Sequence, residues 1–139
     1  MPDRDVVLAK VATIQKCLER IQEVTSLDPA SLDDINRQDI FVLNLQRAIQ
    51  ASIDLASHIV ASEGLGLPET VRDNFALLRD KKVIDPETAS KMEKMTGFRN
   101  IAIHDYQALN LDILKSILTG NLKDLEDFYA AVLTRFRYA

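Results

Sequence analysis

Apolar side chains recur at steps of three and four along most of this chain. In the first stretch, about residues 5–24, they form one stripe at Val7, Val11, Ile14, Leu18 and Ile21. This is the period of an amphipathic α-helix, whereas a half-buried strand alternates at every second residue. With 4 Gly and 4 Pro, the chain has few residues that would separate many strands. The pattern therefore predicts an all-α fold.

About five helices are expected in total. After the first, they span about residues 35–62, about 69–80, a stretch from Pro86 into the segment near Arg99, and about 111–135. The second is apolar over a wide arc, which predicts a central position. The third is expected to point Val71, Phe75 and Leu78 inward, and residues 31–34 to form a polar connection. Gly120 is either tolerated within the last helix or divides it in two.

Composition favours one domain over the whole chain, residues 1–139. Its 47% of hydrophobic residues is enough for a core in a chain of this length. Aromatic residues are few, with five Phe, three Tyr and no Trp. The core is therefore expected to consist mostly of aliphatic side chains, which suits a bundle of helices.

Net charge and cysteine content exclude several classes of function. A net charge of −4 excludes a strongly basic surface for indiscriminate nucleic-acid binding, although a local cluster can still bind RNA. The single Cys17 allows no intramolecular disulfide or thiolate metal site and is expected to be a small buried residue. The amino terminus lacks the apolar centre of a signal peptide, and no apolar run is long enough for a bilayer. A cytoplasmic protein with no membrane partner is expected.

The segment from Arg99 to Tyr106 is the strongest candidate for chemistry. Arginine keeps its charge and forks onto phosphate oxygens, and histidine carries protons near neutral pH. Cleavage of RNA by its own 2′-hydroxyl needs these two functions and no metal. His104 would take a proton from the hydroxyl or give one to the leaving 5′-oxygen, and Arg99 would stabilise charge on the phosphoryl oxygens. Asn100 would hold a phosphate or orient the imidazole.

The spacing of Arg99 and His104 poses a geometric problem. Five steps along a straight α-helix rotate the side chains by about 140°, so they would point apart. They can converge if the helix unwinds near residues 101–103. Alternatively, the arginine of one subunit meets the histidine of another across a two-fold axis. Both routes remain open from the sequence.

Other candidate sites are weaker. No spacing of His, Asp or Glu predicts a metal site, and no glycine-rich loop predicts a nucleotide cofactor, so neither is expected. A stripe of polar or small residues on the second helix is interpreted mainly as a solvated face, with His58 structural. Alternatively, this stripe borders the cleft in which RNA would bind, and Arg47 adds a contact to an RNA phosphate. The stripe comprises Asn44, Arg47, Ala51, Asp54 and His58.

The motif resembles the signature of HEPN-domain ribonucleases, which is an arginine, four residues, a histidine, one residue and a tyrosine. It is most similar to the HepT toxins of HepT/MntA (type VII) toxin–antitoxin systems. The resemblance covers most of the chain, from the first helix to Phe136. Further similar segments are residues 37–39, 43–48, 54–59 and 72–75, together with Gly97-Phe98 before the arginine.

The resemblance implies a homodimer whose two motifs line a shared cleft. Arg99 and His104 match the catalytic pair of the family, and Asn100 matches the polar residue beside the arginine. The implied substrate is RNA, either tRNA or mRNA, cleaved without a metal. Tyr106 matches the tyrosine that a minimal nucleotidyltransferase antitoxin, MntA-like, modifies with AMP to silence the toxin. The bulk and negative charge of that group would block the cleft.

Two rival interpretations remain. In the first, the chain is a non-catalytic helical dimer that serves as a binding platform for the nucleotidyltransferase. In the second, Arg99 only holds ATP phosphate for that partner. His104 distinguishes them from the nuclease, because proton transfer needs an imidazole and phosphate binding does not.

Overall fold

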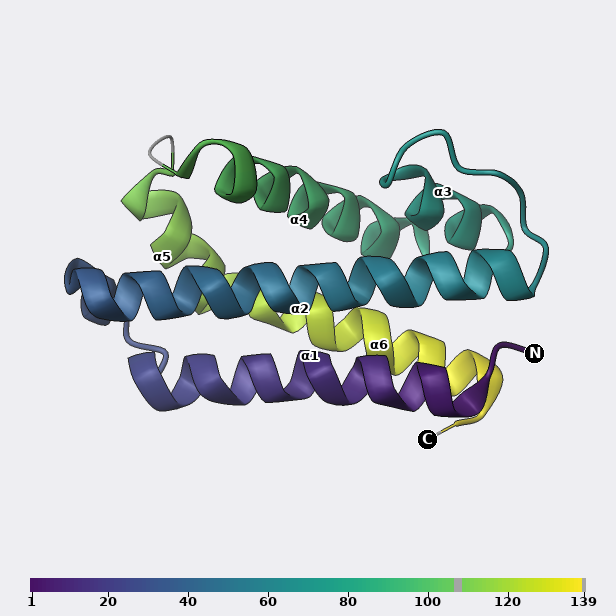
Figure 1. Cartoon of the computed structure of the whole chain (residues 1–139), viewed down its shortest axis with the longest axis horizontal. Helices are drawn as coiled ribbons and strands as arrows, with labels where there is room; N and C mark the ends of the chain where they lie inside the picture. The colour runs from purple at the N-terminus through teal and green to yellow at the C-terminus, as the bar shows by residue number, and fades with distance from the viewer. Residues whose placement is uncertain (107–108, 139) are drawn as a thin grey trace.

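Helices account for the regular structure of the described residues. The computed structural model describes residues 1–106 and 109–138, and no strand occurs within these ranges. The long helices α1 (Arg4–Thr25) and α2 (Ile35–Ser62) lie side by side, with α3 (Asp73–Asp80) and α4 (Pro86–His104) along one side of α2 (Figure 1). Behind them lie α5 (Leu111–Gly120) and α6 (Leu122–Phe136). The predicted all-α bundle is confirmed.

Helix α1 begins and ends where its sequence provides caps. The Asp3 side chain accepts hydrogen bonds from the backbone N–H groups of Asp5 and Val6, and Ser26 closes the helix in the left-handed conformation. Of the predicted stripe, only Leu18 is half-buried and the rest is buried. Cys17 is also buried, as expected.

The polar connection expected at residues 31–34 is partly buried and includes a short helix. Residues Pro29–Asp33 form a 3-10 helix, η1, with Ser31 and Leu32 buried. Asp28 accepts a hydrogen bond from the Ala30 N–H, and Pro29 supplies the fixed φ angle of a first helical position. An aspartate followed by a proline is therefore a start signal here.

Helix α2 is the central helix of the bundle. It contacts α1, α3, α4, α6 and η1, and its buried residues surround most of the helix, as its broad apolar arc predicted. Leu43 is an exception, because 44% of it is exposed.

Helix α3 is shorter than expected. It begins at Asp73, whose carboxylate accepts hydrogen bonds from the N–H groups of Glu69 and Thr70 before the helix. Val71 therefore lies outside the helix and is exposed, whereas Phe75 and Leu78 are buried as predicted. Helix α4 has the predicted start, with Asp85 capping the N–H of Thr88 and Pro86 at the first position.

The last helical region is divided at Gly120, which settles the open alternative and gives six α-helices in the described residues. Asn121 separates α5 from α6, and its side-chain amide donates to Asp124. Phe75 of α3 meets Phe128 of α6 edge-on, with ring centroids 5.5 Å apart, at the centre of the core. No helix within residues 1–106 and 109–138 is long and apolar enough to cross a membrane.

Candidate active site

Helix α4 remains regular through the arginine–histidine segment. Residues 99–104 are α-helical, and the Asp105 N–H donates to the Ile101 carbonyl over 2.8 Å. Of the two alternatives for bringing Arg99 and His104 together, unwinding near residues 101–103 is therefore not observed. On a regular helix Arg99 and His104 point about 140° apart, and no hydrogen bond joins them in the described part of the chain. The alternative through a second subunit is compatible with this regular helix.

Arg99 is half-buried between α4 and α2. Its Nη1 donates to Oε1 of Gln50 over 2.5 Å, and its Nη2 donates to Oδ1 of Asn100, also over 2.5 Å. Its Nε is buried and has no partner among the described residues. The guanidinium is thus held at two corners and retains further donors for a ligand.

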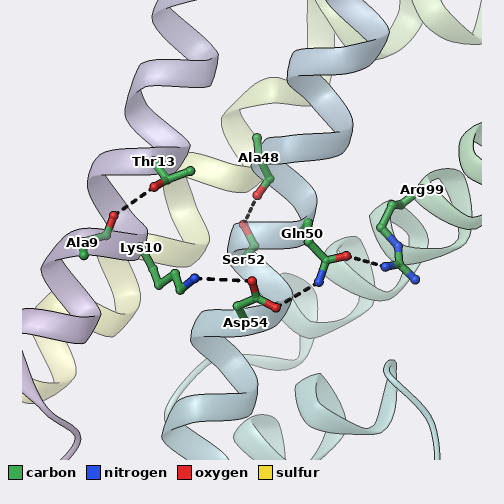
Figure 2. Close-up of polar contacts among 8 residues, drawn as sticks. All are labelled: Ala9, Lys10, Thr13, Ala48, Gln50, Ser52, Asp54 and Arg99. Carbon is green, nitrogen blue, oxygen red and sulfur yellow. Dashed lines mark hydrogen bonds and ion pairs between the residues drawn. The ribbon is translucent and has the colours of Figure 1, made fainter.

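A chain of polar contacts orients Gln50 (Figure 2). The Gln50 Nε2 donates to Asp54 over 2.9 Å, and the other Asp54 oxygen lies 3.5 Å from the Lys10 ammonium on α1. Because a carboxylate can only accept, Asp54 binds the amide nitrogen of Gln50, and the amide oxygen is left to face Arg99. Three helices therefore determine the position of one guanidinium.

The charge of Arg99 is not compensated by a carboxylate. Both of its acceptors are neutral amide oxygens, and it forms no ion pair in residues 1–106 and 109–138. The charge of an arginine in an ion pair is largely compensated by its partner, whereas the charge of Arg99 remains able to attract an incoming anion. Such a fixed guanidinium suits a phosphate group.

Asn100 and His104 share the outer face of α4. Asn100 is half-buried and uses its side-chain oxygen to accept from Arg99, so the structure gives it an arginine-positioning contact. His104 is exposed at the last position of α4. Four residues separate the two, which places them one above the other on the helix surface.

Tyr106 lies just beyond α4 and reaches back to the start of α2. Its hydroxyl donates to Oδ1 of Asp39 over 2.5 Å. Partial burial, followed by this hydrogen bond and the Asp39 charge, raises the pKa of Tyr106 from 10.0 to about 12. This raised pKa keeps the hydroxyl neutral near pH 7. Tyr106 is 40% exposed, and its hydrogen bond to Asp39 lies at the surface. This contact with Asp39 was not predicted.

Arg72 is a second cation that the motif did not reveal. A Cβ placed on Gly97 would lie 2.4 Å from the Arg72 Nη2, so the guanidinium rests directly on this helical glycine. Gly97 and His104 are seven residues apart and lie on the same face of α4. Arg72 forms no ion pair with a described residue. Gly97 itself, two residues before Arg99, is the sequence signal for this close approach, because a glycine has no side chain to obstruct it.

Apolar side chains remain exposed around these polar groups. Leu43 of α2 shares a face with Asp39 and Gln50, and Ile101 and Ile103 flank His104 on α4, with exposed fractions of 44%, 48% and 52%. Two surface hollows of about 660 Å³ and 710 Å³ lie elsewhere, and none of Arg99, His104 and Tyr106 lines them. A single chain thus presents the motif on an open, partly apolar surface.

The polar stripe of α2 is only partly a solvated face. Asn44 and Ala51 are buried, and the Asn44 amide donates to the Ile40 carbonyl of its own helix. His58 accepts a hydrogen bond from the Asp3 N–H, which confirms its structural interpretation. Among the described residues, no three His, Cys, Asp or Glu side chains are grouped as metal ligands would be.

The fold and the motif together define a class of protein. An all-helical bundle that presents an arginine, a histidine and a tyrosine at the end of one helix is the arrangement expected of a HEPN-type ribonuclease. A protein-family model described as "Ribonuclease HepT-like" matches residues 14–132. The mRNA nuclease HepT of Shewanella oneidensis is 43% identical over 124 residues, which cover 89% of this chain and 93% of the relative.

Solved structures agree with this match. A crystal structure of a toxin–antitoxin with AMP-PNP contains a chain that is 40% identical, with a TM-score of 0.89 over 94% of this chain and 98% of that one. The tri-AMPylated Shewanella oneidensis HEPN toxin in complex with MNT antitoxin is 41% identical over the same shares, with a TM-score of 0.88. The chain belongs to the HepT-like ribonuclease family. The predicted family and the predicted class of enzyme, a ribonuclease, are confirmed.

Proposed function

We propose that this chain is the toxin of a HepT/MntA-like system and cleaves RNA, with mRNA as the first candidate substrate because the Shewanella relative is named an mRNA nuclease. The whole chain, residues 1–139, would act as one domain in the cytoplasm. The observation that carries the proposal is that Arg99 is held in place while its charge is not compensated by a carboxylate. Neutral amides hold this cation in place within a motif that matches the family.

The reaction is internal phosphoryl transfer. The ribose 2′-oxygen forms a bond to phosphorus, the bond from phosphorus to the 5′-oxygen breaks, and the products are a 2′,3′-cyclic phosphate and a 5′-hydroxyl. His104 accepts the 2′-hydroxyl proton or donates a proton to the leaving oxygen. Arg99 stabilises the charge that grows on the phosphoryl oxygens, an effect greatest in the transition state.

The active cleft is formed by two copies of the chain in this proposal. Arg99 of one subunit acts with His104 of the partner subunit, because a regular α4 separates them within one chain. The exposed Leu43, Ile101 and Ile103 are the apolar surface that a second copy would cover. Two-fold symmetry then repeats the pair, so each dimer holds two arginine–histidine pairs.

Arg72 supplies a further phosphate contact along the outer face of α4. Its guanidinium lies over Gly97, on the side of the helix that carries His104, and no carboxylate of the described residues neutralises it. An RNA strand that reaches His104 would therefore meet a cation about seven residues earlier, which is roughly 10 Å along the helix.

We further propose that a minimal nucleotidyltransferase antitoxin silences the chain by attaching AMP to Tyr106. Support comes from the tri-AMPylated state of the Shewanella toxin and from the exposed hydroxyl of Tyr106. An attached adenylate adds bulk and negative charge near Arg99 and His104, where the substrate phosphate must bind.

Two experiments test the proposal. First, RNA cut by the purified chain is analysed for its ends, and cyclic phosphate with 5′-hydroxyl ends are expected. A variant with His104→Ala should lose both cleavage and toxicity in cells, and undiminished toxicity would refute the nuclease role of this residue. Second, the chain is co-expressed with a nucleotidyltransferase antitoxin of the MntA type, and the mass of the peptide that contains Tyr106 is measured.

A further inference from the structure

Asp39 lies outside the arginine–histidine motif, yet it binds the one hydroxyl that the antitoxin is proposed to modify. The two residues are 67 positions apart, and the Tyr106 hydroxyl donates to Asp39 over 2.5 Å. Asp39 is exposed on α2 and forms no ion pair with a described side chain. Among the described side chains, the Asp39 carboxylate therefore interacts with the Tyr106 hydroxyl and with no cation.

We infer that Asp39 prepares Tyr106 for AMP transfer by aiming its hydroxyl and accepting its proton as the bond to phosphorus forms. This inference rests on the proposed modification of Tyr106. Asp39 would thus be a residue of the toxin that contributes to the chemistry of its own inactivation.

The step balances with ATP as the donor. The Tyr106 Oη forms a bond to the α-phosphorus, and the bond from that phosphorus to the β-phosphate oxygen breaks. Pyrophosphate leaves with the electron pair, and the hydroxyl proton passes to Oδ1 of Asp39. The products are a tyrosyl adenylate, pyrophosphate and a protonated carboxyl group that returns its proton to water.

The geometry favours attack by the phenol oxygen. Because the O–H bond points at Asp39, the oxygen lone pairs point away from the carboxylate and remain available for phosphorus. The phenol is neutral at physiological pH, since its pKa is about 12, and a neutral phenol is a poor nucleophile. A carboxylate is too weak a base to remove this proton beforehand, so the proton must move while the new bond forms.

The charge of Asp39 also changes at a favourable moment. As a carboxylate it would repel the phosphates of ATP, but a proton taken from Tyr106 neutralises it when the α-phosphorus arrives. An asparagine in its place would still bind the hydroxyl but could not accept the proton. Asp39→Asn therefore separates the aiming function from the proton transfer.

The test uses the full chain, a nucleotidyltransferase antitoxin of the MntA type, Mg²⁺ and ATP labelled at the α-phosphate. Initial rates of labelling are compared for the parent, Asp39→Asn and Asp39→Glu, with Tyr106→Phe as the blank. Asp105→Asn is the matched control, because it removes the same charge one residue from Tyr106 without touching its hydroxyl in the described contacts. Thermal melting confirms that each variant is folded.

Asp39→Asn should label about 100-fold more slowly near neutral pH, while the concentration of chain that half-saturates the reaction stays unchanged. Its rate should also rise about tenfold per pH unit, because only the tyrosinate would then react, whereas the parent rate stays nearly flat. A merely structural role would not change the pH profile. Asp39→Glu should recover part of the rate, and Asp105→Asn should match the parent.

Three results would overturn the inference. One is an Asp39→Asn variant that labels at the parent rate with the parent pH profile. Another is an equal loss in Asp39→Asn and Asp105→Asn, which would mean a general charge effect. The last is a parent chain without label on Tyr106, which would also refute the proposed modification. In the first two cases labelled parent shows that the modification itself stands.

Discussion

The Gln50 side-chain oxygen accepts a hydrogen bond from the Arg99 guanidinium over 2.5 Å, while the Gln50 nitrogen donates to Asp54 over 2.9 Å. A neutral residue thus anchors the cation, and its own partner sets its orientation. A carboxylate at position 50 would hold Arg99 equally well but would cancel the charge that a phosphate needs.

RNA cleavage is therefore expected to fall when residue 50 carries a negative charge. Gln50→Glu should lower RNA cleavage by about 10- to 100-fold, because an ion pair with Arg99 competes with the substrate phosphate. Gln50→Ala keeps the free charge and loses only its anchor, so its loss should be smaller. Single-turnover cleavage of one RNA oligonucleotide at several RNA concentrations measures both. A Gln50→Glu variant that is faster than Gln50→Ala would contradict this account of the arginine.

The Gly97→Ala substitution should weaken RNA binding without lowering the stability of the fold. An added Cβ would lie 2.4 Å from the Arg72 Nη2, so Gly97→Ala must displace this guanidinium. Helical Gly→Ala changes ordinarily stabilise by up to about 1 kcal/mol, and the flexible arginine can move at little cost. We expect unchanged or higher thermal stability, weaker RNA binding and a salt dependence reduced by about one phosphate contact.

Arg72→Ala is the matched comparison for that prediction. It should weaken RNA binding to a similar extent and leave the cleavage products unchanged. Binding titrations of both variants at several salt concentrations provide the measurement. Parent-like RNA affinity in both variants would remove Arg72 from the substrate surface.

The core depends on the contact between α3 and α6. Phe128 is fully buried and meets Phe75 edge-on at 5.5 Å between centroids. Phe128→Ala should lower the free energy of unfolding by about 3–5 kcal/mol, because it removes buried area and leaves a cavity. Denaturant unfolding measures this, with Phe128→Leu as the volume-conserving control that should cost less. A loss below about 1 kcal/mol for Phe128→Ala would mean that the contact is not central.

Tyr106 should ionise at unusually high pH. Its pKa is about 12, against an ordinary value of 10.0. Because the fold favours the protonated phenol, its contribution to stability is complete below pH 10 and is lost as the pH rises toward 12. Asp39→Ala removes two of the three causes, the hydrogen bond and the charge of Asp39, and should lower the pKa of Tyr106. Tyrosinate absorbance, with Tyr106→Phe subtracted, measures the shift, and an unchanged titration would contradict the hydrogen bond.

The fold was largely predictable because its signals are local. The apolar period of α1 and the Asp85–Pro86 start of α4 depend on residues a few positions apart. The errors arose where a local contact overrode the pattern. Asp73 caps the N–H groups before it and moves the start of α3 beyond Val71, and Asp28 with Pro29 turns an expected loop into η1.

The site was predictable only in part. The motif identified Arg99, His104, Asn100 and Tyr106 as one segment because they are close in sequence. Gln50 and Asp39 could not be found this way, since a polar residue on a long helix looks the same whether it contacts solvent or another helix. Their partners lie 49 and 67 residues away, and only the packing of α4 against α2 brings them together.

The central claim is that Arg99 of one subunit acts with His104 of the partner subunit. Arg99→Ala and His104→Ala chains with different tags are co-expressed, and the mixed dimer is purified through both tags. Neither variant alone should cleave RNA. The mixed dimer keeps one intact pair between subunits and should recover about half of the parent activity. A mixed dimer as inactive as the two single variants would contradict the shared cleft.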